Sequence, residues 1–273
     1  MRRSRRRRCP VRVRSLRSSV RLPFHTFAYL HQPALGRPYS PPARNDRRRP
    51  SVEHSVESEN ERPRIGIYGA GKVGTALARL FVAAGHPVLI AGSPRQSALD
   101  LLVGVVAPGA RVADALTLAR ESDIIIVAVP FGKADSLPWD EFDGRIVVDA
   151  MNYWPPIDGT IDEVEADGRS TSEIIGTRNT AARLVKSFNH LGYHEMEDDA
   201  LPAGAPLRRA LAVAGDDDEA KAAVARIIEA IGFDAVDIGA LREGAHLQPG
   251  GPIFGRELDR TELERLAHER VTA

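Results

Sequence analysis

The glycine-rich stretch GAGKVG at residues 69–74 has residue types and a spacing that could bind phosphate. Two phosphate-binding loops produce such a run. The loop that binds nucleoside triphosphates, GxxxxGK followed by Ser or Thr, fits residues 66–72, but Val73 stands where the magnesium-ligating hydroxyl is required. Gly66 also falls inside an apolar run rather than at its end. The sequence therefore disfavours a triphosphate loop.

The dinucleotide fingerprint GxGxxG matches the same stretch without exception. It requires a strand before it and a helix after it, and an apolar run over 64–69 and a helical period over 72–85 provide both. The glycines permit a tight turn, close approach of the backbone to a pyrophosphate, and close helix–strand packing, while the helix N-terminus supplies amide donors. We expect the dinucleotide to contact Gly69, Ala70, Gly71, Lys72, Val73 and Gly74.

The end of the second expected strand indicates which dinucleotide binds. NAD-binding proteins carry an Asp or Glu there, which accepts hydrogen bonds from the ribose hydroxyls. This sequence reads LIAGSPRQ, with Ser93 24 residues after Gly69 and no acid before Asp100. Because a hydroxyl and a guanidinium bind a 2′-phosphate that a carboxylate would repel, Ser93 and Arg95 favour NADP. Arg95 could instead be a solvated residue in the first turn of the next helix.

The surrounding pattern alternates strands with helices, which is typical of an α/β fold. The run at 123–130 is apolar throughout, as in a parallel sheet covered on both faces. We expect a Rossmann-like, doubly wound, mostly parallel sheet in a single compact domain. The expected strands are 64–69, 86–93, 123–130, 144–152, 182–189, 208–216 and 233–239, and the expected helices are 72–85, 95–105, 114–123 and 217–232.

We expect the chain to have three parts, of which the first differs from the rest in composition. Residues 1–62 hold 16 Arg and five acids, which predicts a disordered N-terminal extension. This extension could be a transit peptide, an arm for nucleic acid or a membrane surface, or upstream sequence from a misassigned start codon. Residues 63–256 are expected to form the NADP-binding domain, and residues 257–273 a C-terminal helix or tail.

The rest of the composition excludes several classes of protein. Outside the extension, 21 basic and 32 acidic residues argue against nucleic acid as a partner. The single cysteine, Cys9, excludes an internal disulfide framework. The longest clear apolar run, 124–131, is too short for a membrane helix. We expect a cytoplasmic protein with no membrane partner.

Five blocks together carry a family resemblance: GIYGAGKVGTALARLFVAAGHPVLIAGSPR, DIIIVAVPFGK, RIVVDAMNYW, RLVKSFNHLGYHEMEDDA and LQPGGPIFG. With them, residues 64 to about 255 resemble the NADP oxidoreductases that depend on the deazaflavin coenzyme F-420, and their bacterial dinucleotide-binding relatives. This family also resembles the cytosolic reductase domain of membrane metalloreductases. The resemblance implies hydride transfer between NADP(H) and coenzyme F-420 or a flavin.

The resemblance also implies roles for individual residues. The loop from Ala70 to Val73 would hold the pyrophosphate, and Ser93 with Arg95 the 2′-phosphate. Archaeal members usually place Arg directly after the Ser, whereas Pro94 intervenes here. The nicotinamide pocket would be lined by Val129 and Pro130, at the end of a parallel strand, and Asn152 would lie on the carboxamide or ribose side.

Both reactants in such a transfer are cofactors, so the protein need only stack them and exclude water, and we expect no catalytic side chain. The candidate pocket walls are Tyr153, Trp154, Phe188, Asn189 and His190. Tyr153 and Trp154 could equally pack their loop onto the core. The loop 247–255 could close over the second ring or be a plain surface loop.

A metal site is a further reading of the HLGYHE segment. His190 and His194 are four residues apart and Glu195 follows, but Gly192 favours a loop, so we expect no metal. Two other functions stay open: a non-catalytic NADP-binding sensor or partner-binding protein, and a dehydrogenase of a small carbonyl or imine. The latter class normally adds a large helical C-terminal domain. The expected partners are a dinucleotide, a second redox cofactor and a second copy in a homodimer.

Overall fold

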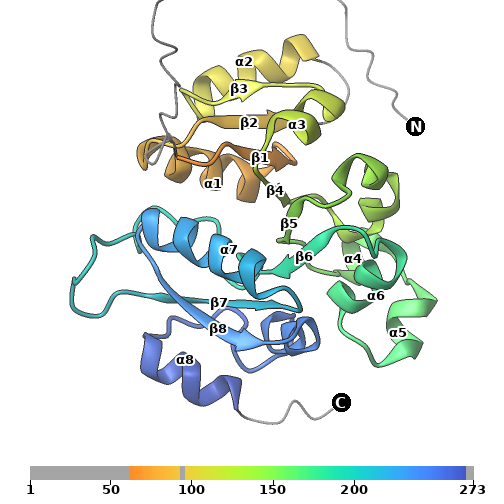
Figure 1. Ribbon diagram of the computed structural model, residues 1–273, viewed down its shortest axis with the longest axis vertical. Coiled ribbons are helices and arrows are strands. Elements are labelled where there is room, and N and C mark those ends of the chain that lie inside the picture. Colours follow the sequence, from red (N-terminus) through yellow and green to blue (C-terminus); the bar gives the residue numbers. More distant parts are fainter. Residues whose placement is uncertain (1–61, 93–95, 269–273) are drawn as a thin grey trace, which may run out of the picture. The chain divides into compact units, whose positions relative to one another are not determined.

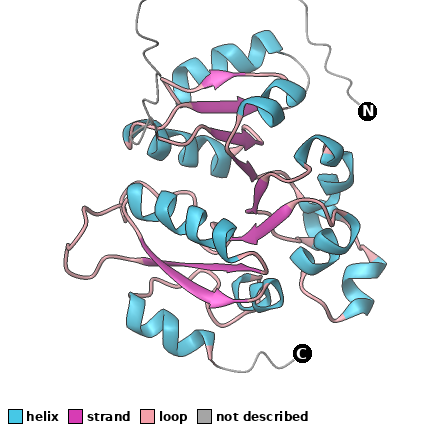
Figure 2. Ribbon diagram, viewed as in Figure 1, coloured by secondary structure: helices cyan, strands magenta, loops and turns pink. Residues whose placement is uncertain are grey.

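The computed structural model describes residues 62–92 and 96–268. They form an eight-stranded sheet in the order β3-β2-β1-β4-β5-β6-β7-β8, with helices on both faces (Figures 1 and 2). The strands are β1 (Ile65–Tyr68), β2 (Val88–Ala91), β3 (Arg111–Val112), β4 (Ile124–Val127), β5 (Ile146–Asp149), β6 (Arg183–Lys186), β7 (Ala210–Gly215) and β8 (Asp234–Gly239). The pairs among the first six strands are parallel, β7 runs antiparallel to β6, and β8 is parallel to β7. The expected doubly wound, mostly parallel α/β sheet is confirmed.

The helices differ from the expectation mainly between β4 and β6. The helices are α1 (Lys72–Ala83), α2 (Gln96–Val106), α3 (Ala115–Glu121), α4 (Pro155–Asp158), α5 (Asp162–Asp167), α6 (Thr171–Arg178), α7 (Asp218–Ala230) and α8 (Arg260–Ala267). Three 3₁₀ segments accompany them: η1 (Phe131–Ser136), η2 (Trp139–Phe142) and η3 (Leu241–Leu247). The four expected helices and seven expected strands are present. The sequence analysis did not anticipate β3, α4, α5, α6 or the 3₁₀ segments.

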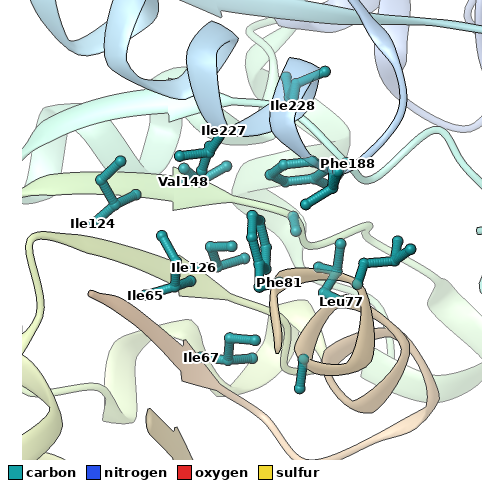
Figure 3. Packing of buried hydrophobic residues seen from close by; sticks show 14 of the residues in the cluster. Ile65, Ile67, Leu77, Phe81, Ile124, Ile126, Val148, Phe188, Ile227 and Ile228 are labelled. Atoms are coloured by element: carbon teal, nitrogen blue, oxygen red, sulfur yellow. The ribbon is translucent and has the colours of Figure 1, made fainter. Parts of the chain in front are cut away.

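The central strands are buried on both faces. In β4, Ile124 and Ile126 contribute to the core under α1 and α7, while Ile125 and Val127 contribute to the core on the other face. Figure 3 shows how the first core packs around Phe81 of α1 and the isoleucines of β1 and β4. Successive side chains of a strand point to opposite faces, so only an unbroken apolar run satisfies both.

The last part of the described chain packs on the end of the sheet. Leu258, together with Leu263 and Leu266 of α8, forms an apolar cluster with residues of β7 and β8 such as Ala212 and Val236. Asp259 caps α8, because its side chain accepts a hydrogen bond from the backbone N–H of Glu262. Among residues 62–92 and 96–268, no helix combines the length and apolarity needed to cross a bilayer.

Candidate functional site

The glycine-rich loop forms the corner between β1 and α1. Gly69 has φ +116°, a backbone conformation that residues other than glycine rarely adopt. A Cβ atom at position 74 would lie 1.8 Å from the carbonyl oxygen of Gly69, so the third glycine is required for the approach of the helix to the strand. The geometry at both positions is the one that the fingerprint demands.

The second glycine of the loop stands next to open space. Apart from Gly71 itself and its two chain neighbours, no described residue has a heavy atom within 4 Å of a Cβ built at Gly71. Gly71 is also the N-cap of α1, and the first turn of that helix contains no acidic residue. The N-terminal amides of a helix carry a partial positive charge and lack intrahelical acceptors. The corner can therefore accept an anion between the second glycine and the helix.

A pocket of ≈540 Å³ begins at this corner. It brings together five predicted site residues, Gly69, Ala70, Gly71, Val129 and Pro130. Its other walls are mostly aliphatic, and Lys133 is the one charged side chain among its lining residues. The remaining lining residues are Tyr68, Gly92, Ala98, Leu99, Leu102, Ala128, Ser136 and Leu137. A slot of this composition suits a flat, uncharged ring system that is attached to a phosphate.

Four other predicted site residues do not line this pocket. Lys72, Val73 and Gly74 continue the corner into α1, and Asn152 lies beyond the pocket, after β5. Ser93 and Arg95 fall outside the described residues; the pocket reaches Gly92, directly before them. The prediction that they bind a 2′-phosphate is therefore untested by the structure.

The tyrosine that ends β1 is a polar wall of the pocket that the sequence analysis did not single out. The hydroxyl of Tyr68 is buried and has no hydrogen-bond partner among the described residues. Burial, and secondarily the charge of Asp114, raise the pKa of Tyr68 to about 12. The group therefore stays a neutral hydroxyl at physiological pH.

The carboxyl ends of four neighbouring strands align at one edge of the sheet. Tyr68, Val127, Asp149 and Lys186 are register partners across β1, β4, β5 and β6. Three residues beyond these four positions stand, respectively, Gly71, Pro130, Asn152 and Asn189. We call the glycine-rich corner at residues 69–74 the phosphate corner, after its predicted ligand. Neighbouring strands lie about 4.8 Å apart, so this corner and the end of β5 are separated by two spacings, roughly 10 Å. The predicted residues therefore form a row along the crevice where α/β sheets bind ligands.

The two asparagines of this row bond to each other. Asn152 donates from Nδ2 to the carbonyl oxygen of Asn189 at 2.7 Å, and Asn189 donates from Nδ2 to Asn152 Oδ1 at 2.9 Å. Asn189 also donates to the carbonyl oxygen of Leu247, the last residue of η3, at 2.5 Å. The amide pair thereby ties together the segments that follow β5 and β6 and the start of the 247–255 loop.

The predicted aromatic wall is divided between the surface and the core. Tyr153 packs its ring on Phe131, and its hydroxyl forms hydrogen bonds with neighbours in the following segment. This matches the alternative in which Tyr153 packs its loop onto the core. Trp154 is 45% exposed and meets Phe254 of the 247–255 loop, with ring centroids 6.3 Å apart. Phe188 is fully buried against Phe81, so its assignment to a pocket wall is wrong.

His190 is likewise buried rather than exposed to a pocket. Its Nε2 accepts a hydrogen bond from the backbone N–H of Ala212, and its Nδ1 has no partner among the described residues. Burial, followed by the charges of Arg209 and Lys186, lowers the pKa of His190 to about 3. His194 is exposed, and no three His, Cys, Asp or Glu side chains in the described ranges gather closely enough to hold a metal ion.

A buried ion pair under the row was not predicted. Lys186 donates to Asp149 Oδ2 at 3.2 Å and to the carbonyl oxygen of Met151 at 2.6 Å. The side chains of Lys186 and Asp149 are 0% and 1% exposed to solvent. Ser172 of α6 donates to the same Asp149 oxygen at 2.6 Å. This network fixes the turn that carries Asn152. The sequence signal was a lysine at the end of an apolar strand, where no water is available to solvate it.

A family model matches the part of the chain that carries Gly71, Pro130 and Asn152. Residues 64–153 match the family model described as "NADP oxidoreductase coenzyme F420-dependent". The matched region runs from β1 to the residue after Asn152, so it includes the glycine-rich corner, Pro130 and Asn152. The resemblance to the F-420-dependent NADP oxidoreductases that was inferred from the sequence is confirmed over this region.

Two solved structures have a similar fold. A hypothetical protein from Sinorhizobium meliloti is 29% identical, with a TM-score of 0.62, over 73% of this chain and 96% of that one. A candidate F-420-dependent NADP reductase from Arthrobacter sp. is 25% identical, with a TM-score of 0.55, over 66% of this chain and 86% of that one. Both alignments extend well beyond residue 153 in coverage.

One curated relative is the metalloreductase STEAP3 of Rattus norvegicus. It is 28% identical over 198 residues, which are 71% of this chain. The same alignment covers 37% of STEAP3, so the chain spans little more than a third of the length of that relative.

Proposed function

Since residues 64–153 match a family of NADP-dependent oxidoreductases, we propose that this protein binds NADP(H) along the row from Gly71 to Asn152 and transfers hydride to or from a deazaflavin or flavin. One observation carries the proposal: Gly71, beside which an added Cβ would meet open space, lines the same pocket as Val129 and Pro130. In this arrangement the corner would hold the pyrophosphate, and the end of β4 would support the nicotinamide.

The residues present fit such a cofactor. The first turn of α1 contains no acidic residue, and the pocket has mostly aliphatic walls with one lysine and no carboxylate. A bound nicotinamide would supply the hydride chemistry itself. The protein would orient the dinucleotide, keep water from the ring, and present the exposed indole of Trp154 to a second flat ring.

The acceptor is proposed from the family description and from the structure near Trp154. Trp154 and Phe254 come from segments about 100 residues apart and meet at the carboxyl edge of the sheet, beside Asn152. Two aromatic faces at such a place can stack on a deazaflavin or flavin ring. A homodimer and a cytoplasmic location, both expected from the sequence, stay predictions.

Two successive measurements test the proposed oxidoreductase function, first binding and then turnover. Calorimetry with NADPH and NADH on the purified chain should show binding, tighter for NADPH. Absorbance at 340 nm should then fall when coenzyme F-420, FMN or FAD is added to protein and NADPH. The absence of binding heat for both nucleotides would overturn the proposal; binding without turnover of any acceptor would favour the non-catalytic sensor.

The choice of NADP over NAD rests on Ser93 and Arg95. Removing a charge-assisted contact to the 2′-phosphate with Arg95→Ala should weaken NADPH about tenfold and leave NADH unchanged. Equal loss for both nucleotides would show that Arg95 supports the loop rather than the phosphate. Arg111→Ala is a matched control. Arg111 lies on the edge strand β3 and pairs with Glu121, the last residue of α3.

A further inference from the structure

One carboxylate joins the segments that leave β4 and β5. Asp158, the last residue of α4, accepts a hydrogen bond at Oδ1 from the backbone N–H of Gly132 at 2.9 Å. Its Oδ2 accepts a second hydrogen bond from the backbone N–H of Trp154 at 2.8 Å. Gly132 belongs to η1, which directly follows Pro130. The two oxygens of Asp158 therefore hold one segment each.

The two bonded amides occupy equivalent positions beyond the sheet. β4 and β5 are parallel neighbours, with Val127 opposite Asp149. Gly132 stands five residues after Val127, and Trp154 stands five residues after Asp149. Asp158 thus bridges two segments that leave neighbouring strand ends, which are about 4.8 Å apart.

The bridge fixes the backbone of Trp154 in particular. Trp154 is the N-cap of α4, and its carbonyl oxygen accepts from the backbone N–H groups of Ile157 and Asp158, both at 2.8 Å. The side chain of Asp158 returns a bond to the N–H of Trp154, so both backbone polar groups of Trp154 are held within one turn. The bond to Gly132 then ties this turn to η1.

The approach of α4 to η1 is close at the bridge. A Cβ built at Gly132 would lie 3.3 Å from Asp158 Oδ1 and 3.4 Å from the Asp158 carbonyl oxygen, so glycine suits this contact. Beside it, the rings of Phe131 and Tyr153 pack with centroids 5.9 Å apart. Ring contacts tolerate a range of separations, whereas hydrogen bonds have a narrow range of lengths. The carboxylate is therefore the contact that defines the spacing.

We propose that Asp158 is a positioning residue for hydride transfer, which sets the separation between the pocket wall at Val129 and Pro130 and the indole of Trp154. The inference rests on the proposed function, in which these two places support the nicotinamide and the acceptor ring. Reacting atoms must come within about 3–3.5 Å of each other, and a misplacement of about 1 Å can cost a hundredfold in rate. Asp158 acts through the backbone of Trp154 and contacts neither ring.

Removing the bridge should slow turnover and spare nucleotide binding. Asp158→Ala should lower kcat by about tenfold or more, while the Kd of NADPH and the KM of the acceptor each change less than about threefold. Asp158 does not line the pocket, and Trp154 and Phe254 remain to hold the acceptor. Asp158→Asn should have an intermediate kcat, because its oxygen can still accept one of the two bonds. Calorimetry gives the Kd, and rates of NADPH oxidation are measured with whichever of coenzyme F-420, FMN and FAD the wild-type protein reduces.

Two further variants separate positioning from a structural role. Asp259→Ala is the matched control, because the Asp259 carboxylate also accepts a backbone N–H, that of Glu262 at 2.9 Å, as the cap of α8. It should keep the wild-type kcat. Asp158→Ala should also have little further effect in a Trp154→Ala protein, because a residue that acts through another loses its influence when that other residue is removed.

The contrary results are distinct. A wild-type kcat in Asp158→Ala, a full loss of rate that persists in the Trp154→Ala background, or an equal loss in Asp259→Ala overturns the positioning role while the proposed function stands. Loss of NADPH binding in Asp158→Ala shows that the bridge supports the pocket itself and also overturns it. A wild-type protein that binds no NADPH, or that reduces none of the three acceptors, overturns the proposed function and this inference together.

Discussion

Lys72 donates a hydrogen bond from Nζ to the hydroxyl of Tyr193 at 3.0 Å, although the two residues are 121 positions apart. The ammonium group also lies 4.9 Å from the centroid of the tyrosine ring. Lys72 is the first residue of α1 and belongs to the phosphate corner. The contact therefore links the corner to the segment after β6 that carries Asn189.

This contact predicts opposite effects of two substitutions. Lys72→Met should weaken NADPH about tenfold, because it removes a cation from the phosphate corner. Tyr193→Phe removes the hydroxyl that engages the ammonium group and should strengthen NADPH binding by about twofold to fivefold. Calorimetry measures both. Weaker binding in Tyr193→Phe would instead assign the hydroxyl to the ligand.

The phosphate corner predicts that neighbouring glycines respond differently to a methyl group. Gly71→Ala should fold normally, since nothing lies within 4 Å of its Cβ, yet lose most dinucleotide affinity because the methyl group occupies the space for the phosphate. Gly74→Ala should unfold more easily, since its Cβ would lie 1.8 Å from a backbone oxygen. Thermal melts and NADPH titrations distinguish the two outcomes.

Gly104→Ala provides the control for that pair. Its Cβ also meets nothing within 4 Å, but Gly104 lies in the interior of α2, where alanine stabilises a helix by about 0.5–1 kcal/mol. This variant should bind NADPH as the wild type does. Wild-type affinity in Gly71→Ala would contradict the placement of the pyrophosphate.

The buried Lys186–Asp149 pair predicts a large loss of stability on Lys186→Met. The variant leaves the Asp149 carboxylate buried with only the Ser172 hydroxyl and the Met151 N–H as donors. Breaking a buried pair in this way costs about 3–5 kcal/mol. Urea denaturation followed by circular dichroism measures the change.

An exposed ion pair serves as the comparison for Lys186. Arg120 contacts Glu141 at 3.1 Å with most of the arginine in solvent, so Arg120→Met should cost less than about 1 kcal/mol. A loss below 1 kcal/mol in Lys186→Met as well would mean that the lysine is not charged in the fold. Burial does lower the pKa of Lys186.

His190 predicts a specific pH dependence of stability. Its pKa is about 3 in the folded protein against an ordinary value of 6.5, so the unfolded chain takes up a proton that the folded chain refuses. Stability should therefore fall as the pH drops from about 6.5 toward 3, by about 1.4 kcal/mol per pH unit from this group. Protonation of Nε2 would replace the acceptor of the Ala212 N–H by a donor.

The contribution of His190 is isolated by His190→Gln, which can still accept from Ala212 but does not titrate. Urea titrations at pH 7, 6, 5 and 4 should show that the free energy of unfolding falls less steeply with pH in the variant. The contributions of the carboxylates that both proteins share cancel in this comparison. Parallel slopes for the two proteins would contradict the assignment.

The sequence was informative where one local pattern determines the structure. GxGxxG between a strand and a helix defined the corner, and the unbroken apolar run of β4 predicted a sheet covered on both faces. The short helices after Asn152 escaped notice because α4 and α5 bury little: no residue of α4 is buried, so no apolar period marks it.

Side-chain roles that depend on distant neighbours could not be read in the same way. Phe188 and Asn189 are adjacent, yet one packs in the core and the other bonds to Asn152 and Leu247. Phe188 has φ +63°, so the chain leaves its strand geometry there and alternation no longer predicts which side chain points inward. The charge of Lys186 gave no hint of Asp149, which lies 37 residues earlier.

The steric match between Gly69 and Gly74 has a kinetic consequence. The carbonyl oxygen of Gly69 fills the space beside Gly74, so the turn has one conformation in the folded protein. Ligand binding therefore removes little conformational freedom from it. Nucleotide capture at this turn should therefore proceed in one step, with an observed rate that rises linearly with NADPH concentration and shows no plateau from a preceding rearrangement.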